Sequence, residues 1–128
     1  MQNQREHRLS NALFMRIAGG PLRAYSILIH TGRKSGRTYQ IPITIFPMGD
    51  GFILALLYGD AAHVDWCQNI MAAGGCTIRT RWQTYACDRP EIVGPDQALP
   101  AYSPLFRFYY RRVQVKQFLW VHRTPSPL

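Results

Sequence analysis

Three cations stand within five positions of one predicted turn, in the stretch ILIHTGRKSGRTYQIPI that runs from Ile27 to Ile43. They are Arg33, Lys34 and Arg37, and they stand among the small residues Gly32, Ser35 and Gly36. Glycine and serine let backbone N–H groups converge on an anion, while arginine and lysine add charge-assisted hydrogen bonds to phosphate or carboxylate oxygens. The turn is therefore a candidate anion site, and a solvated hairpin tip is the alternative. It lacks the GxxxxGK pattern of a Walker loop, so nucleotide hydrolysis has no support.

A second cluster falls on a helix predicted between Asp60 and Ala73. Trp66 and Asn69 lie at i, i+3 on one face of it, and His63 joins them one turn earlier. An indole beside an amide suits a flat, polar, aromatic ligand, because the indole covers a ring and the amide fixes a carbonyl or a phosphate. The alternative is a core tryptophan next to a capping asparagine.

Side chains that could catalyse a reaction unaided are hard to find. Asp60 and Asp65 form no obvious carboxylate pair, and Ser35 lacks a base and an orienting group. The three cysteines and four histidines show neither metal-ligand spacing nor a Cys–His couple, so we predict no metal site. Buried free thiols, as in a reducing cytoplasm, are expected. If the protein is an enzyme, a cofactor should carry the reaction.

The amino-acid composition limits the classes of molecule that the protein is expected to bind. Fifteen Lys and Arg against seven Asp and Glu give a net charge of +8, which favours anionic ligands or surfaces. No nucleic-acid-binding motif accompanies that charge, so we expect no nucleic acid partner. No apolar run is long enough to span a bilayer, and the polar N-terminus is unlike a signal peptide, which predicts a cytoplasmic protein. An amphipathic helix is predicted within 1–20; it packs on the domain or contacts a membrane peripherally.

The elements form a mainly β pattern. Strands are predicted at 25–31, 39–46, 52–58, 76–81, 84–93 and 115–122. Helices are expected at 60–73 and from Ser103 to about Arg112, with a loop at 94–100 and a frayed tail at 124–128. Five to six short antiparallel strands without regular helix alternation favour a small closed or partly closed barrel, with 1–128 as a single domain.

Two motifs together resemble a known family. TGRKSGRTYQIP, followed along the chain by YGDAAHVDWCQNIMAAGG, is similar to the deazaflavin-dependent nitroreductases, coenzyme F420-dependent oxidoreductases of split β-barrel fold. The family texture is a TGRKSG turn, a proline in the next strand, and W-x-x-N-x-x-A in a helix. The similarity covers roughly 22–93 well and the ends weakly.

The resemblance implies a cofactor, coenzyme F420, with FMN as a less favoured alternative. The cofactor-binding residues that it implies are Thr31, Gly32, Arg33, Lys34, Ser35, Gly36, Arg37, Pro42, Trp66 and Asn69. The turn would grip the phosphate and polyglutamate tail, and the ring would lie beside the third strand and the Trp66 helix. Hydride would then pass between the cofactor and a substrate.

The substrate is expected to be apolar and planar, quinone-like or nitroaromatic, because aromatic side chains would form its pocket. Those side chains are Tyr58, Tyr102, Phe106 and Tyr109. The proton that follows hydride transfer would come from solvent or from Tyr58, the candidate catalytic residue. The alternative function is a non-catalytic binder of a lipid, a fatty acid or a flavin-type small molecule in the same groove.

Overall fold

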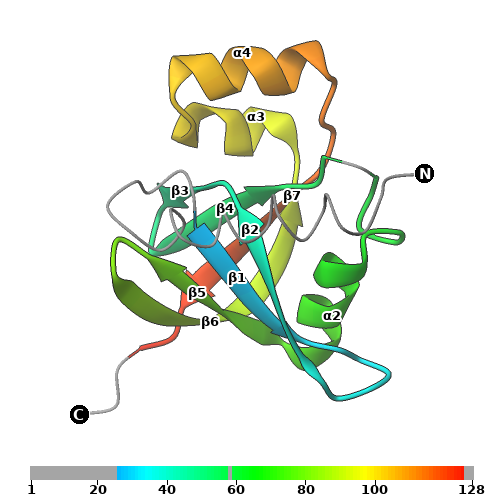
Figure 1. Cartoon of the computed structure of the whole chain (residues 1–128). Coiled ribbons are helices and arrows are strands. Elements are labelled where there is room, and N and C mark those ends of the chain that lie inside the picture. The colour runs from blue at the N-terminus through cyan, green and yellow to red at the C-terminus, as the bar shows by residue number, and fades with distance from the viewer. Residues whose placement is uncertain (1–25, 58, 126–128) are drawn as a thin grey trace, which may run out of the picture.

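The computed structural model describes residues 26–57 and 59–125. The predicted N-terminal helix and Tyr58 lie outside this part of the chain. Seven antiparallel strands and three α-helices are present in the described residues (Figure 1), which confirms the mainly β prediction. The strands are β1 (Ser26–Thr31), β2 (Thr38–Ile43), β3 (Ile45–Met48), β4 (Gly51–Ala55), β5 (Gly75–Thr80), β6 (Gln83–Val93) and β7 (Phe118–Arg123). The helices are α2 (Asp65–Ala73), α3 (Pro95–Ala98) and α4 (Pro104–Arg112), with a 3₁₀ turn at Leu99–Ala101.

The seven strands form one sheet that curls into a half-barrel. Its strand order is β2-β1-β5-β6-β7-β4-β3, so the two edge strands are β2 and β3. These two strands are consecutive in the chain, with only Thr44 between them. The opposite edges of the sheet must therefore converge at Thr44, which accounts for the curl. The single strand predicted at 39–46 is in fact these two, and the strand count is seven instead of about six.

Strand β4 separates two hydrophobic cores, and all five of its residues are buried. Side chains of a strand alternate between its faces. Leu54 belongs to the core inside the half-barrel, which α2 helps to cover, whereas Ile53 and Ala55 belong to a second core. That second core lies beneath α3 and α4, which stack beyond one end of the sheet in Figure 1. Helix α2 thus covers one face of the sheet, and α3 and α4 cover part of the other face.

Local hydrogen bonds explain where α2 begins and ends. The helix starts at Asp65 and not at Asp60, because the Asp60 carbonyl first accepts the N–H groups of His63 and Val64 in a separate turn. At its C-terminus Gly74 adopts φ 78° and donates its N–H to the Ile70 carbonyl. A glycine in the left-handed conformation at this position is a common way for an α-helix to end.

The C-terminal elements differ from expectation in two places. The segment GPDQALP, predicted as a loop, forms α3 and the 3₁₀ turn, because Pro95 stands at the first helical position, where its missing N–H costs nothing. Helix α4 has its predicted bounds, and the final strand begins at Phe118, three residues later than predicted. None of the helices in the described ranges is long and apolar enough to cross a membrane.

Candidate functional site

The basic turn is held in shape by its own backbone. It closes the β1–β2 hairpin, where the Gly32 N–H donates to the Arg37 carbonyl at 2.8 Å and the Gly36 N–H donates to the Gly32 carbonyl at 2.9 Å. Gly36 has φ 72°, a left-handed conformation that favours glycine. A Cβ on Gly32 would lie 2.8 Å from both the Ser35 Oγ and the Tyr39 ring. The turn itself therefore accounts for the two glycines of the motif.

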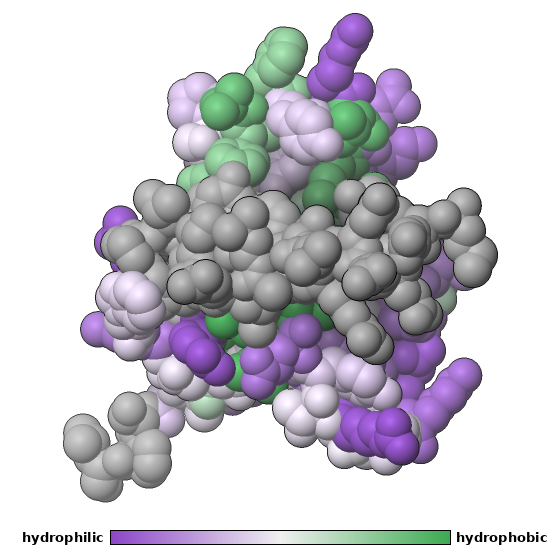
Figure 2. All heavy atoms as spheres, in the orientation of Figure 1, coloured by the Kyte–Doolittle hydropathy of each residue, from purple (hydrophilic) through white to green (hydrophobic). Residues whose placement is uncertain are grey.

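The backbone amides of the turn are largely committed to partners within the protein. Besides the two glycine N–H groups, the Arg37 N–H donates to the Ser35 Oγ at 3.2 Å, and the Arg33 N–H donates to the Asn69 Oδ1 at 3.1 Å. These four amides do not form the converging cradle that the sequence suggested. The charge available to an anion comes instead from the exposed side chains of Lys34 and Arg37. Figure 2 shows this end of the molecule as strongly hydrophilic.

Arg33 differs from the other two cations because it clamps the turn onto α2. Its guanidinium donates to the Asn69 Oδ1 at 2.7 Å and pairs with the Asp65 carboxylate at 3.4 Å. The Arg33 side chain is only 27% exposed, whereas the Asp65 side chain is 88% exposed. Asn69 is itself buried, and it receives two hydrogen bonds from one residue of the turn. The first function of Arg33 and Asn69 is thus to join the hairpin to the helix.

A histidine that the sequence analysis did not single out completes this polar chain. The Nδ1 of His30, on β1, lies 3.1 Å from the Asn69 Nδ2, in a buried contact. The imidazole stacks on the ring of Tyr39, the residue opposite it on β2, with 5.6 Å between the ring centroids. Burial lowers the pKa of His30, so its ring is neutral at physiological pH.

A cleft of about 500 Å³ lies between the turn and α2. Six of its lining residues were predicted from the sequence, namely Gly32, Arg33, Lys34, Ser35, Trp66 and Asn69. Four were not, namely His30, Tyr39, Ile41 and Asp65. His30 could have been found from strand alternation, because it follows the core residue Leu28 at i+2 and so places a polar ring on an inward face. The cleft combines cations, an indole and a neutral imidazole.

Other predicted site residues lie elsewhere. Thr31, Gly36, Arg37 and Pro42 belong to the hairpin but do not line the cleft. His63 pairs with Asp60 at 2.7 Å, before α2 begins. The structure does not bring the aromatic cluster to the cleft: Tyr102 and Phe106 pack in the second core, where the Tyr102 hydroxyl donates to the Ile53 carbonyl at 3.3 Å. Tyr109 is half exposed on α4.

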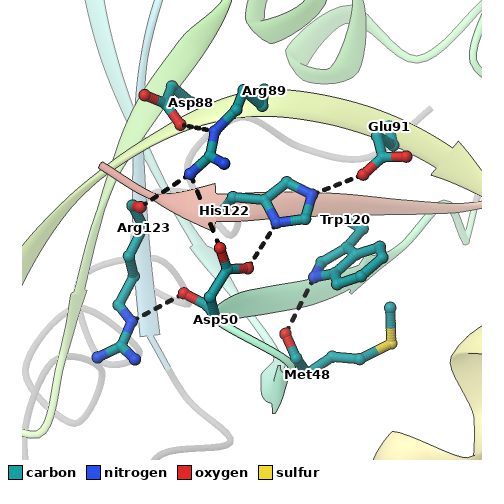
Figure 3. A network of polar contacts seen from close by, with 8 residues as sticks. All are labelled: Met48, Asp50, Asp88, Arg89, Glu91, Trp120, His122 and Arg123. Atoms are coloured by element: carbon teal, nitrogen blue, oxygen red, sulfur yellow. Dashed lines mark hydrogen bonds and ion pairs between the residues drawn. The ribbon is translucent and has the colours of Figure 1, made fainter. Parts of the chain in front are cut away.

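A second polar network lies on other strands, away from this cleft (Figure 3). His122 on β7 is held between the Asp50 carboxylate at 2.5 Å and the Glu91 carboxylate at 2.6 Å, and Arg89 pairs with Asp50 at 3.7 Å. Hydrogen bonding to Asp50 raises the pKa of His122, and the same contact lowers the pKa of Asp50. The network ties the β3–β4 turn to β6 and β7. Within residues 26–57 and 59–125, no group of three or more His, Cys, Asp or Glu side chains is arranged so that it could hold a metal ion.

Comparison with known proteins shows which solved structures share this fold. No protein-family model matches the chain, and no curated protein matches its sequence significantly. Solved structures do match. An F420-H2 dependent reductase, FDR-A, superposes with a TM-score of 0.56 at 15% identity, over 78% of this chain and 95% of the other. HutZ, the heme storage protein from Vibrio cholerae, gives 0.60 at 10% identity, over 90% and 88%.

A further solved structure resembles the chain more loosely. Atu2129 from Agrobacterium tumefaciens, a protein of unknown function, gives a TM-score of 0.52 at 18% identity, over 87% of this chain and 53% of the other. At such identities the three likenesses show the fold alone. Because one neighbour is a reductase and another stores heme, the function must be argued from the cleft and its side chains.

Proposed function

We propose that the protein is a deazaflavin-dependent oxidoreductase, in which hydride passes between reduced coenzyme F420 and an apolar planar acceptor of the quinone or nitroaromatic type. The observation that carries the proposal is the cleft between the TGRKSG turn and the Trp66 helix. Its residue types correspond to the two halves of such a cofactor, an anionic tail and a polar planar ring. The fold likeness to FDR-A supports the proposal.

The residues of the cleft fit this cofactor. Its volume of about 500 Å³ lies within the roughly 300–1,000 Å³ of ordinary ligand pockets. Lys34 and the nearby Arg37 are exposed cations that can meet a phosphodiester or glutamate carboxylates, and Arg33 adds charge at the same edge. Trp66 offers an aromatic wall for a ring, and His30 and Asn69 provide polar groups at depth. The chain thus presents charge at the entrance and a polar aromatic interior.

Each part of the chain has a role in this proposal. The deazaflavin supplies the hydride when bound. Arg33 and Asn69 hold the turn against α2 and so keep the two walls of the cleft at a fixed separation. Lys34 and Arg37 bind the anionic tail, which leaves the ring against Trp66. The buried His30 and Asn69 supply polar contacts to the ring, and Tyr58 remains the candidate proton donor.

The proposal is tested by titrating the purified protein with reduced coenzyme F420, FMN and a fluorescent fatty acid. We expect tight binding of coenzyme F420, and a loss of about 1–3 kcal/mol of binding free energy in Lys34→Ala, as for one charge-assisted hydrogen bond. The matched control is Arg112→Ala, which removes an exposed cation from α4 without approaching the cleft.

Turnover then separates an enzyme from a binder. Reduced coenzyme F420 with wild-type protein should reduce quinone and nitroaromatic acceptors faster than it does without protein. If coenzyme F420 does not bind while the fatty acid does, the non-catalytic alternative replaces the proposed function. If coenzyme F420 binds but neither acceptor is reduced, the acceptor class is wrong.

A further inference from the structure

The orientation of the Asn69 amide follows from its partners. Its oxygen lies 3.1 Å from the Arg33 backbone nitrogen and 2.7 Å from a guanidinium nitrogen of the same residue, and both of these are donors. An amide nitrogen in that place would face two donors with no acceptor, so the oxygen must be there. The Asn69 Nδ2 is thereby directed to the His30 ring, 3.1 Å away.

The tautomer of His30 follows from the orientation of Asn69. Because the Asn69 Nδ2 can only donate, the His30 Nδ1 must accept and carries no proton. A neutral imidazole has one ring proton, which must then lie on Nε2. His30 is 93% buried on its β1 strand and lines the cleft, and stacking on Tyr39 limits rotation of the ring. Arg33 therefore sets the state of His30 through Asn69.

We propose that His30 is a fixed hydrogen-bond donor of the cleft, whose Nε2–H binds an acceptor atom of the ligand. The exposed cations at the turn would meet the anionic part of the ligand, so His30 would face its planar part. The acceptor of the His30 hydrogen bond is therefore a carbonyl oxygen or a ring nitrogen of that planar part. The identity of the ligand in this inference rests on the proposed function. The predicted protonation state of His30 is independent of the proposed function. His30 acts as a binding residue and not as an acid, because the N–H of a neutral imidazole donates a hydrogen bond but is a very weak acid.

The protonation state can be measured without any ligand. Nitrogen-15 NMR of the imidazole distinguishes a protonated Nε2 from a protonated Nδ1, and the signal of His30 is the one lost in His30→Asn. We expect a neutral Nε2–H tautomer at neutral pH. The Asn69→Asp variant supplies the contrast, since a carboxylate beside Nδ1 can only accept a hydrogen bond and should therefore give a signal with Nδ1 protonated.

Two conservative variants separate binding from folding. His30→Asn places an amide oxygen near the Nδ1 position, so it keeps an acceptor for Asn69 but loses the donor at Nε2. His30→Gln places an amide N–H near the Nε2 position, so it keeps the donor but loses the acceptor for Asn69. We expect His30→Asn to bind coenzyme F420 roughly five- to tenfold more weakly at nearly normal stability. His30→Gln should bind nearly normally at reduced stability.

The outcomes separate this inference from the proposed function. Parallel losses of binding and stability in both variants, or an Nδ1–H signal in wild type, would overturn the role of His30 even if coenzyme F420 binds. If coenzyme F420 fails to bind wild type, the proposed function is lost. The same pair of variants is then compared with FMN and the fluorescent fatty acid, and equal binding by wild type and His30→Asn with every probe contradicts the inference.

Discussion

Replacing Asn69 with alanine should destabilise the protein strongly. Its side chain makes three hydrogen bonds, two from Arg33 and one to His30, and it is 6% exposed. Each hydrogen bond contributes a net stability of about 1 kcal/mol, so the loss of all three lowers the free energy of unfolding by about 3 kcal/mol. The higher helix propensity of alanine offsets roughly 0.5 kcal/mol of this loss. For a domain of this size the expected fall in Tm is about 10 °C.

The assay is thermal and urea unfolding of wild type beside Asn69→Ala and a control. Met71→Ala is the matched control, because Met71 stands on the same helix with 44% of its surface exposed, and its change should stay within about 0.5 kcal/mol. A fall in Tm no larger than that of the control would refute the reasoning. It would mean that the hairpin is not fastened to α2 by this amide in solution.

Three further predictions concern the charged and thiol groups. Arg33→Ala should lower the melting temperature, because Arg33 joins the turn to α2, whereas Lys34→Ala should leave it unchanged. Differential scanning calorimetry of the two variants measures this difference. Because its folded pKa is raised, His122 contributes stability that is complete below its unfolded pKa of about 6.5 and is lost as pH rises through the folded value. The carboxylate of Asp50, with a lowered pKa, loses its contribution as pH falls, so the advantage of wild type over His122→Gln should peak at mildly acidic pH in unfolding titrations. Burial raises the pKa of Cys67 to about 11, so Ellman's reagent should modify it only after unfolding; rapid modification of native protein would contradict this.

Much of the hairpin and of the fold class was predictable from the sequence, because local chemistry determines both. The glycines of the turn, Gly74 after α2 and Pro104 at the start of α4 act over a few residues, so each specifies its turn or helix end locally. The break at Thr44 was missed because the residues on both sides of it are β-formers. Only the long-range order of the sheet shows that the chain must change from one edge to the other there.

The polar chain of the cleft could be predicted only in part. The sequence showed Arg33 and Asn69 as separate ligand-binding candidates, but their contact joins residues 36 positions apart, which spacing along a helix or a strand cannot reveal. The location of Tyr102 and Phe106 could not be predicted either, because their spacing along the chain fits a core as well as a pocket. Burial decides between the two, and burial depends on the elements that pack above them.

The interior position of β7 in the sheet affects how the protein folds during synthesis. This strand pairs with β4 on one side and β6 on the other, so Ile53 meets Trp120 across 67 positions of sequence. Contacts this distant in sequence slow folding, because the intervening chain must close a long loop first. During synthesis β4, apolar on both faces, has no partner on that side until residues 118–123 leave the ribosome. The nascent chain therefore depends on β7, or on a chaperone, to keep β4 from aggregating.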